Sequence, residues 1–140
     1  MSATTLLAGI SRTTDPTVML RRFLGLDAVV TGTNGIAYIA ASGPLGRLLG
    51  VDSGLLLGVG IVILAYGLGV ALVASRPEPH PAAVTAVVDI NVVYAVVSIL
   101  AVLLWFEPTT AGAVWIPLQA LVVAGFGVAQ WAALRAVLKG

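Results

Sequence analysis

Four long apolar runs, separated by short polar segments, make up most of the chain. The runs cover about residues 23–42, 54–74, 82–106 and 111–135. Each run contains roughly 20 residues or more, the length that an α-helix needs to cross the hydrocarbon core of a bilayer. The pattern therefore predicts an all-α fold, a four-helix transmembrane bundle formed by residues 16–140.

Polar residues with helix-starting chemistry precede two of the apolar runs. Asp15 is followed by Pro16, which places a capping carboxylate before a proline at the first helical position. Asp52 and Ser53 offer the same kind of cap to the second run. Residues 1–15 lack the basic start and continuous apolar core of a signal peptide, so we expect a mobile cytoplasmic tail there.

Glycine and proline mark where the first two runs end. Gly43 and Pro44 are expected to end the first run, and residues 45–50 are too short to span, which favours a turn of interfacial helix. The three prolines of SRPEPHP, residues 75–81, forbid a continuous helix and predict a hydrophilic loop, after which Pro81 can begin the third span.

Composition agrees with a membrane protein and excludes several other classes. Hydrophobic residues make up 59% of the chain and charged residues 9%, against roughly 25% charged residues in soluble domains. The net charge of +1 gives no basic surface for nucleic acid. With no cysteine and one histidine, the sequence offers no disulfide framework, no thiolate nucleophile and no histidine-rich metal cage, and it predicts no cofactor.

The distribution of lysine and arginine predicts the orientation in the membrane. The two termini and the loop between spans two and three hold six of the seven basic residues, and the other two loops hold only Arg47. Positive charge favours the cytoplasmic side, so both termini are expected there, in a multi-pass protein of the inner (plasma) membrane. Trp105 and Trp115 would then lie at the outer interface and Trp131 at the inner one.

Polar side chains form a stripe on each of two spans. At 100° per residue, the stripe of span one falls within an arc of about 60° and contains Asp27, Thr31, Asn34 and Tyr38. The stripe of span four has a similar width and contains Trp115, Gln119, Phe126 and Gln130. Because the two helices run in opposite directions, Gln130 comes level with Asp27 and Gln119 with Tyr38, so the stripes could face each other.

Span three carries two polar residues that cannot share a face. Asp89 and Asn91 are two positions apart and point roughly 160° away from each other on a helix. One of them should look into the bundle and the other toward a neighbouring helix or a second subunit. Depth along the spans also predicts a polar layer near the middle of the membrane, formed by Asn34, Tyr66, Asn91, Tyr94 and Gln119.

Ionisable residues inside a bilayer cost about 2.5 to 3.5 kcal/mol on insertion scales and are functional candidates by default. A carboxyl group in apolar surroundings can act as a general acid, and a better solvated one as a base. Asp89 as acid and Asp27, nearer the cytoplasmic edge, as base would suit isomerisation, epoxide opening or cyclisation of a lipophilic small molecule. The candidate substrate-binding residues are Asn34, Tyr66, Asn91, Tyr94, Gln119, Gln130 and Trp115.

Two other functions remain open at this point. A titrating carboxylate could couple proton movement to transport of a small molecule, and a four-span chain would then have to assemble as a homo-oligomer to enclose a path. The chain could also be a non-catalytic scaffold or partner subunit, in which polar side chains only bridge helices. Small residues four apart, such as Gly54 and Gly58, would let helices approach closely, either inside one bundle or at a dimer face.

Two stretches of the chain resemble known proteins. They are LRRFLGLDAVVTGTNGIAYIAASGPLGRLLG, residues 20–50, and TTAGAVWIPLQALVVAGFGVAQWAALR, residues 109–135. In these the chain is similar to small four-span bacterial membrane proteins of unknown function, and in size and layout it resembles DoxX-like proteins. The resemblance implies the four-helix architecture and no particular chemistry.

Overall fold

The computed structural model describes residues 15–104 and 107–139, and this part of the chain is helical with short connections. Of the tail expected at residues 1–15, residues 1–14 lie outside the described residues. The described helices are α2 (Pro16–Ala40), α3 (Ser42–Leu49), α4 (Ser53–Ser75), α5 (Pro81–Leu104) and α6 (Thr110–Lys139).

Four of these helices, α2, α4, α5 and α6, are long and apolar enough to cross a membrane. Their outer surfaces carry large hydrophobic side chains that are strongly exposed, for example Val62 at 66%, Leu72 at 70% and Leu103 at 72%. Apolar surface of this extent is stable in contact with lipid and unfavourable in water. The predicted all-α four-helix transmembrane bundle is confirmed, and the chain is an integral membrane protein.

The helix starts follow the predicted caps. The Asp15 carboxylate accepts a hydrogen bond from the backbone N–H of Thr17 at 2.9 Å, and Asp52 accepts one from Leu55 at 3.0 Å. α2 ends at Ala40, close to the predicted end at about residue 42, but Pro44, which was expected to end the run, lies in the first turn of α3. Proline is tolerated there because its missing N–H would have no partner within the helix.

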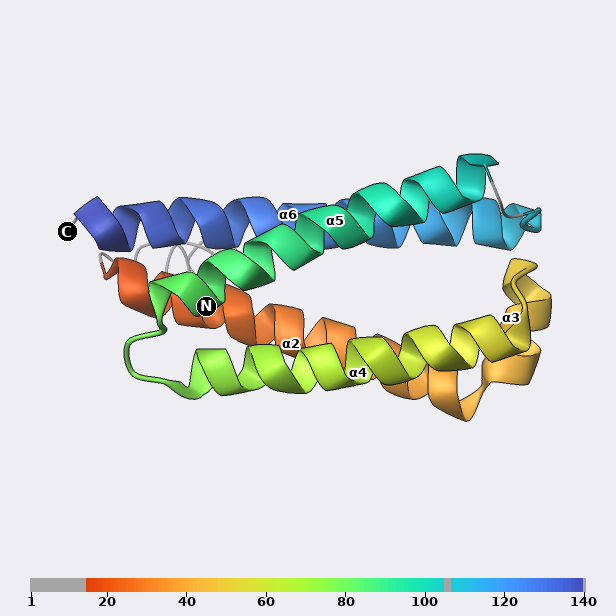
Figure 1. Cartoon of the computed structure of the whole chain (residues 1–140), viewed down its shortest axis with the longest axis horizontal. Helices are drawn as coiled ribbons and strands as arrows, with labels where there is room; N and C mark the ends of the chain where they lie inside the picture. The colour runs from red at the N-terminus through yellow and green to blue at the C-terminus, as the bar shows by residue number, and fades with distance from the viewer. Residues whose placement is uncertain (1–14, 105–106, 140) are drawn as a thin grey trace, which may run out of the picture.

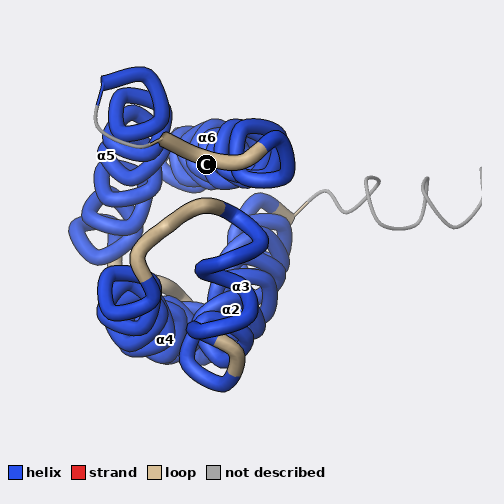
Figure 2. Tube along the Cα trace, turned by 90° about the vertical axis from the view of Figure 1, so that its right-hand side faces the viewer, coloured by secondary structure: helices blue, strands red, loops and turns tan. Residues whose placement is uncertain are grey.

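The four spans pack as two antiparallel pairs (Figures 1 and 2). α2 packs mainly on α4 and α5 mainly on α6, and the pairs are joined chiefly through α2 and α6. α4 and α5 follow each other in the chain but scarcely touch. In Figure 1, a loop leads from the end of α4 to the start of α5, and α5 then crosses obliquely to lie along α6. A side of the bundle is therefore left open between α4 and α5.

Glycines allow α2 and α4 to approach until their backbones nearly touch. A Cβ atom at Gly35 would lie 2.9 Å from the carbonyl oxygen of Gly60, and one at Gly67 would lie 3.0 Å from the nitrogen of Gly32. The expected close contact at Gly58 is wrong, because a Cβ there would meet nothing within 4 Å. The tight helix contact is thus inside one bundle, two positions further along α4.

The short helix α3 closes one end of the space between the two pairs (Figure 2). It ends at Leu49, and the capping residue that follows, Gly50, has a φ of 72°, which is left-handed and suits glycine. The backbone N–H of Thr109, before α6, donates to the carbonyl oxygen of Leu49 at 3.2 Å, and the Thr109 hydroxyl donates to that of Leu48. These bonds fasten α3 to the start of α6.

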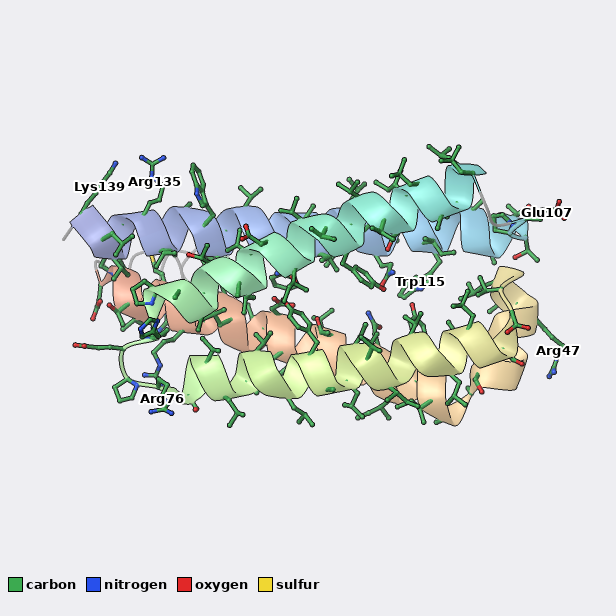
Figure 3. The ribbon with its side chains drawn as sticks, in the orientation of Figure 1. Arg47, Arg76, Glu107, Trp115, Arg135 and Lys139 are labelled. Carbon is green, nitrogen blue, oxygen red and sulfur yellow. The ribbon has the colours of Figure 1, made fainter. Side chains whose placement is uncertain are left out.

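The two ends of the bundle differ in charge (Figure 3). Arg76, Arg135 and Lys139 lie at the end where α2 begins and α6 ends, and Arg47 and Glu107 lie at the opposite end, near α3. The α4–α5 connection lies at the more basic end (Figure 1).

Candidate functional site

Asp27 lies inside the bundle, with no part of its side chain exposed. It sits three turns into α2, on the face that meets α6. Its Oδ1 accepts a hydrogen bond from the hydroxyl of Thr31, one turn along the helix, at 2.9 Å. Its Oδ2 accepts two more, from Nδ2 of Asn91 at 2.9 Å and from Nε2 of Gln130 at 2.8 Å.

The partners of Asp27 are bonded to one another and to α4. The Asn91 Nδ2 group also donates to Oε1 of Gln130 at 3.0 Å, and the Asn91 Oδ1 accepts from the hydroxyl of Tyr66 at 2.9 Å. Asn91 and Gln130 are almost fully buried. We call Asp27, Thr31, Tyr66, Asn91 and Gln130 the polar network; it joins all four spans.

The burial of Asp27 corrects the expectation that it would be the better solvated of the two aspartates. The polar stripe of α2 faces amides from α5 and α6, and these cover the carboxylate completely. Among the described residues, every buried polar side-chain atom has a hydrogen-bond partner. A satisfied network of this kind fixes how helices pack in lipid, where unpaired polar groups are costly.

The predicted meeting of the two polar stripes is confirmed, with one change of register. Gln130 bonds Asp27 as expected. Tyr38 was expected level with Gln119, but it accepts a hydrogen bond from the indole N–H of Trp115 at 2.8 Å, one turn away. Gln119 donates to the hydroxyl of Tyr94 on α5 at 2.9 Å.

A cavity of about 370 Å³ lies between the two helix pairs, next to the polar network. All four spans contribute to its wall, which is mostly apolar. The five residues of the predicted mid-membrane layer all line it, together with Thr31 and Trp115. Trp115 projects into the space between the pairs (Figure 3). The volume falls in the range of small-molecule sites, roughly 300–1,000 Å³.

Among the described polar side chains that line the central cavity, the Asn34 amide is the one without a hydrogen-bond partner. It is half-buried and lines both the central cavity and a neighbouring one of about 500 Å³ between α2, α3 and α6. Within residues 15–104 and 107–139, no hydrogen bond to its amide is found, whereas Asn91, Gln119 and Gln130 are all bonded. Its amide can therefore donate to, and accept from, a molecule in the cavity.

Asp89 lies apart from Asp27. It is exposed on α5, and it lines a groove of about 580 Å³ between α4 and α5. Asp27 lines neither this groove nor the central cavity. As the helical geometry requires, Asn91 points inward and Asp89 outward. The structure thus brings Asp27 together with Asn91, Tyr66 and Gln130, and leaves Asp89 outside that group.

Tyr38 is a site residue that the candidate set omitted. It is buried and accepts a hydrogen bond from Trp115. It lines both the groove between α4 and α5 and the cavity between α2, α3 and α6. Its place in the polar stripe of the first span was the available signal. The apolar members of the wall, such as Ile63 and Val123, could not be found in this way, because similar residues cover every face of the spans.

Comparisons of the chain with protein-family models, with curated proteins and with solved structures give no match. The function must be inferred from the geometry of the site.

Proposed function

We propose that this integral membrane protein binds a lipophilic small molecule in its central cavity. The observation that supports the proposal most directly is the Asn34 amide, which faces an apolar cavity and has no partner among the described residues. Few polar groups in an otherwise apolar wall are typical of small-molecule sites, where the polar groups fix the orientation of the ligand. The ligand would be mostly apolar and would present one hydrogen-bonding group to Asn34.

The molecule would enter from the bilayer. α3 covers one end of the space between the helix pairs, and the polar network, followed by an apolar core cluster that includes Leu24 and Val84, fills the space toward the other end. The cavity wall includes side chains that also face the outer surface, such as Val62 at 66% exposed and Leu118 at 51%. Lateral access suits a ligand dissolved in lipid.

The geometry favours binding over acid and base catalysis by the two carboxylates. Both oxygens of Asp27 are engaged by donors of the polar network, and Asp89 lines a different space. A scaffold would favour dry packing with every polar group paired, which the cavity and Asn34 do not provide. A transporter would bind its cargo before moving it, so binding is the function that the geometry supports best.

We further propose that the end holding Arg76, Arg135 and Lys139 faces the cytoplasm. Arg21 and Arg22, in the first two turns of α2, belong to the same end, and Arg47 is the basic residue of the described loops and helices at the other. Lysine and arginine near span ends favour the cytoplasmic side. The Arg135 guanidinium also lies over the Trp131 ring, at 4.9 Å, an arrangement that suits an interface.

Replacing Asn34 by leucine tests the role of its amide. The test uses the protein in lipid nanodiscs and Nile red, a neutral lipophilic dye with a carbonyl acceptor. We expect Nile red to bind Asn34→Leu about three- to tenfold more weakly than the wild type, because the loss of one hydrogen bond lowers affinity by about this factor. Fluorescence titration, corrected with empty nanodiscs, measures the affinity.

Pyrene, a hydrocarbon with no hydrogen-bonding group, is the matched control ligand. Its affinity should change little in Asn34→Leu, because leucine keeps the wall apolar and similar in size. Equal Nile red affinities for the two proteins would contradict the role given to Asn34, and no saturable binding of either dye to the wild-type protein would contradict the proposed function.

A further inference from the structure

Asp89 is a carboxylate in a position where lipid alone cannot stabilise it. It lies eight residues after Pro81, the start of α5, or about 12 Å along the helix axis. Its side chain is exposed, and no residue of the described chain forms a hydrogen bond or ion pair with it. A carboxylate at this depth needs a partner from outside these residues.

The surroundings of Asp89 indicate what kind of partner fits. The groove between α4 and α5 has walls of apolar side chains, including Leu55 and Val59 from α4 and Val93 and Val97 from α5. None of the described residues that line it is basic. Asp89 stands at one side of this apolar space, as a single negative charge without a counter-ion in the described structure.

The deeper wall of the groove is polar as well as apolar. Tyr94 and Gln119, bonded to each other, belong both to the groove and to the central cavity, so the two spaces meet there. A transmembrane helix of another protein would bring mainly apolar side chains to these groups. The volume of about 580 Å³ is also that of a small-molecule site. A small ligand therefore fits the groove better than a helix does.

We propose that the α4–α5 groove binds a lipophilic monocation, an apolar organic molecule that carries one positive charge, with Asp89 as its counter-ion. The inference rests on the proposed function, because the groove meets the central cavity at Tyr94 and Gln119, and it adds a second site that binds a charged class of ligand. The apolar body of the ligand lies against Val93, Val97 and the facing residues of α4, and its charge lies beside Asp89. Opposite charges attract strongly where water is scarce, so Asp89 selects cations over neutral and anionic molecules of the same shape.

Two ions of nearly the same shape and opposite charge provide the test: tetraphenylphosphonium and tetraphenylborate. Equilibrium dialysis against the protein in nanodiscs, corrected with empty nanodiscs, measures their binding. We expect tetraphenylphosphonium to bind saturably to the wild-type protein. Its affinity for Asp89→Asn should be lower by about tenfold or more. Tetraphenylborate should bind the wild-type protein more weakly than its cationic counterpart, and Asp89→Asn should reduce that difference.

Two further variants control for charge and folding. Asp52→Asn also removes one negative charge but lies outside the groove, and asparagine caps a helix as well as aspartate does, so its cation affinity should match the wild type. Asp89→Glu keeps the charge and should retain affinity within about threefold. Nile red binding to the central cavity, measured in each variant, shows whether the fold and the proposed function are intact, separately from the binding of the cation.

The outcomes separate the inference from the function on which it rests. Equal cation affinity in wild type and Asp89→Asn, with Nile red binding intact, would overturn the role of Asp89 and leave the proposed function standing. If neither tetraphenylphosphonium nor Nile red binds the wild-type protein saturably, the inference and the proposed function are both wrong. If Asp89→Asn instead dissociates an oligomer and leaves cation binding unchanged, Asp89 belongs to a subunit interface and the proposal is wrong.

Discussion

Replacing Asp27 by leucine is expected to lower the free energy of unfolding by about 2 to 4 kcal/mol, because three hydrogen bonds lose their acceptor inside the bundle. Leucine would leave Nε2 of Gln130 without a partner, and the Nδ2 group of Asn91 would keep only its bond to Oε1 of Gln130. The measurement is reversible unfolding in mixed micelles, with the mole fraction of dodecyl sulfate as denaturant and circular dichroism as the signal.

Asp27→Asn is the matched control. Its Oδ1 can accept from Asn91 and Gln130, while its Nδ2 donates to the Thr31 hydroxyl, so all the bonded positions remain filled. We expect a loss of about 1 kcal/mol, since bonds to a neutral acceptor are weaker than bonds to a carboxylate. An asparagine variant as unstable as the leucine variant would show that the charge, and not the acceptor geometry, holds the network together.

Replacing Gly60 by leucine is expected to lower the free energy of unfolding by about 2 to 3 kcal/mol through overpacking. A Cβ atom there would lie 2.9 Å from Cβ of Tyr38 and 3.0 Å from the carbonyl oxygen of Gly35, so α2 and α4 must move apart. The same unfolding titration measures the loss. A shift of Tyr38 would also disturb its bond to Trp115, which the emission spectrum can report in a protein with Trp105 and Trp131 changed to phenylalanine.

Gly58→Leu is the control on the same helix. Among the described residues, apart from its own stretch of helix, no heavy atom lies within 4 Å of a Cβ at this position, so the side chain would extend into lipid and the stability should change by no more than about 0.5 kcal/mol. If the two leucine variants were equally stable, the close α2–α4 contact would not be present in the membrane.

Much of the fold can be predicted because its signals are local. The length of each apolar run sets a span, and the carboxylates of Asp15 and Asp52 mark helix starts through bonds to residues two or three positions away. The meeting of α2 and α6 was also predictable, because within the apolar part of each helix the larger polar side chains lie along one face. Gln130 and Asp27 are 103 positions apart and yet come together as the two stripes require.

The rotation of the more uniform spans could not be predicted. α4 is apolar all round, so nothing in its pattern distinguishes Gly58 from Gly60, and only the packing against α2 separates a lipid-facing glycine from a contact glycine. On α5 the sequence shows that Asp89 and Asn91 point apart, but not which is buried. That choice depends on Asp27, Gln130 and Tyr66, which come from three other helices.

The solvation of the two aspartates was mispredicted for a related reason. Depth along the helix suggested that Asp27 would reach water at the membrane edge. Helix contacts decide its environment instead, because two amides from α5 and α6 cover it. Distance from the membrane edge is a weak guide when the residue faces protein.

Energy transfer from Trp115 to bound pyrene tests the central claim, a ligand cavity inside the bundle, most directly. Trp115 lines the cavity, and a protein with Trp105 and Trp131 changed to phenylalanine carries it as the single donor. Val123→Phe would fill part of the cavity, whereas Val128→Phe, at a position 64% exposed and outside the cavity wall, would not.

We expect the quenching of Trp115 to saturate at one pyrene per chain. Val128→Phe should leave the pyrene affinity unchanged, and Val123→Phe should lower it by about tenfold or more. Quenching that rises in proportion to the pyrene dissolved in the bilayer, to the same extent in all three proteins, would contradict the account.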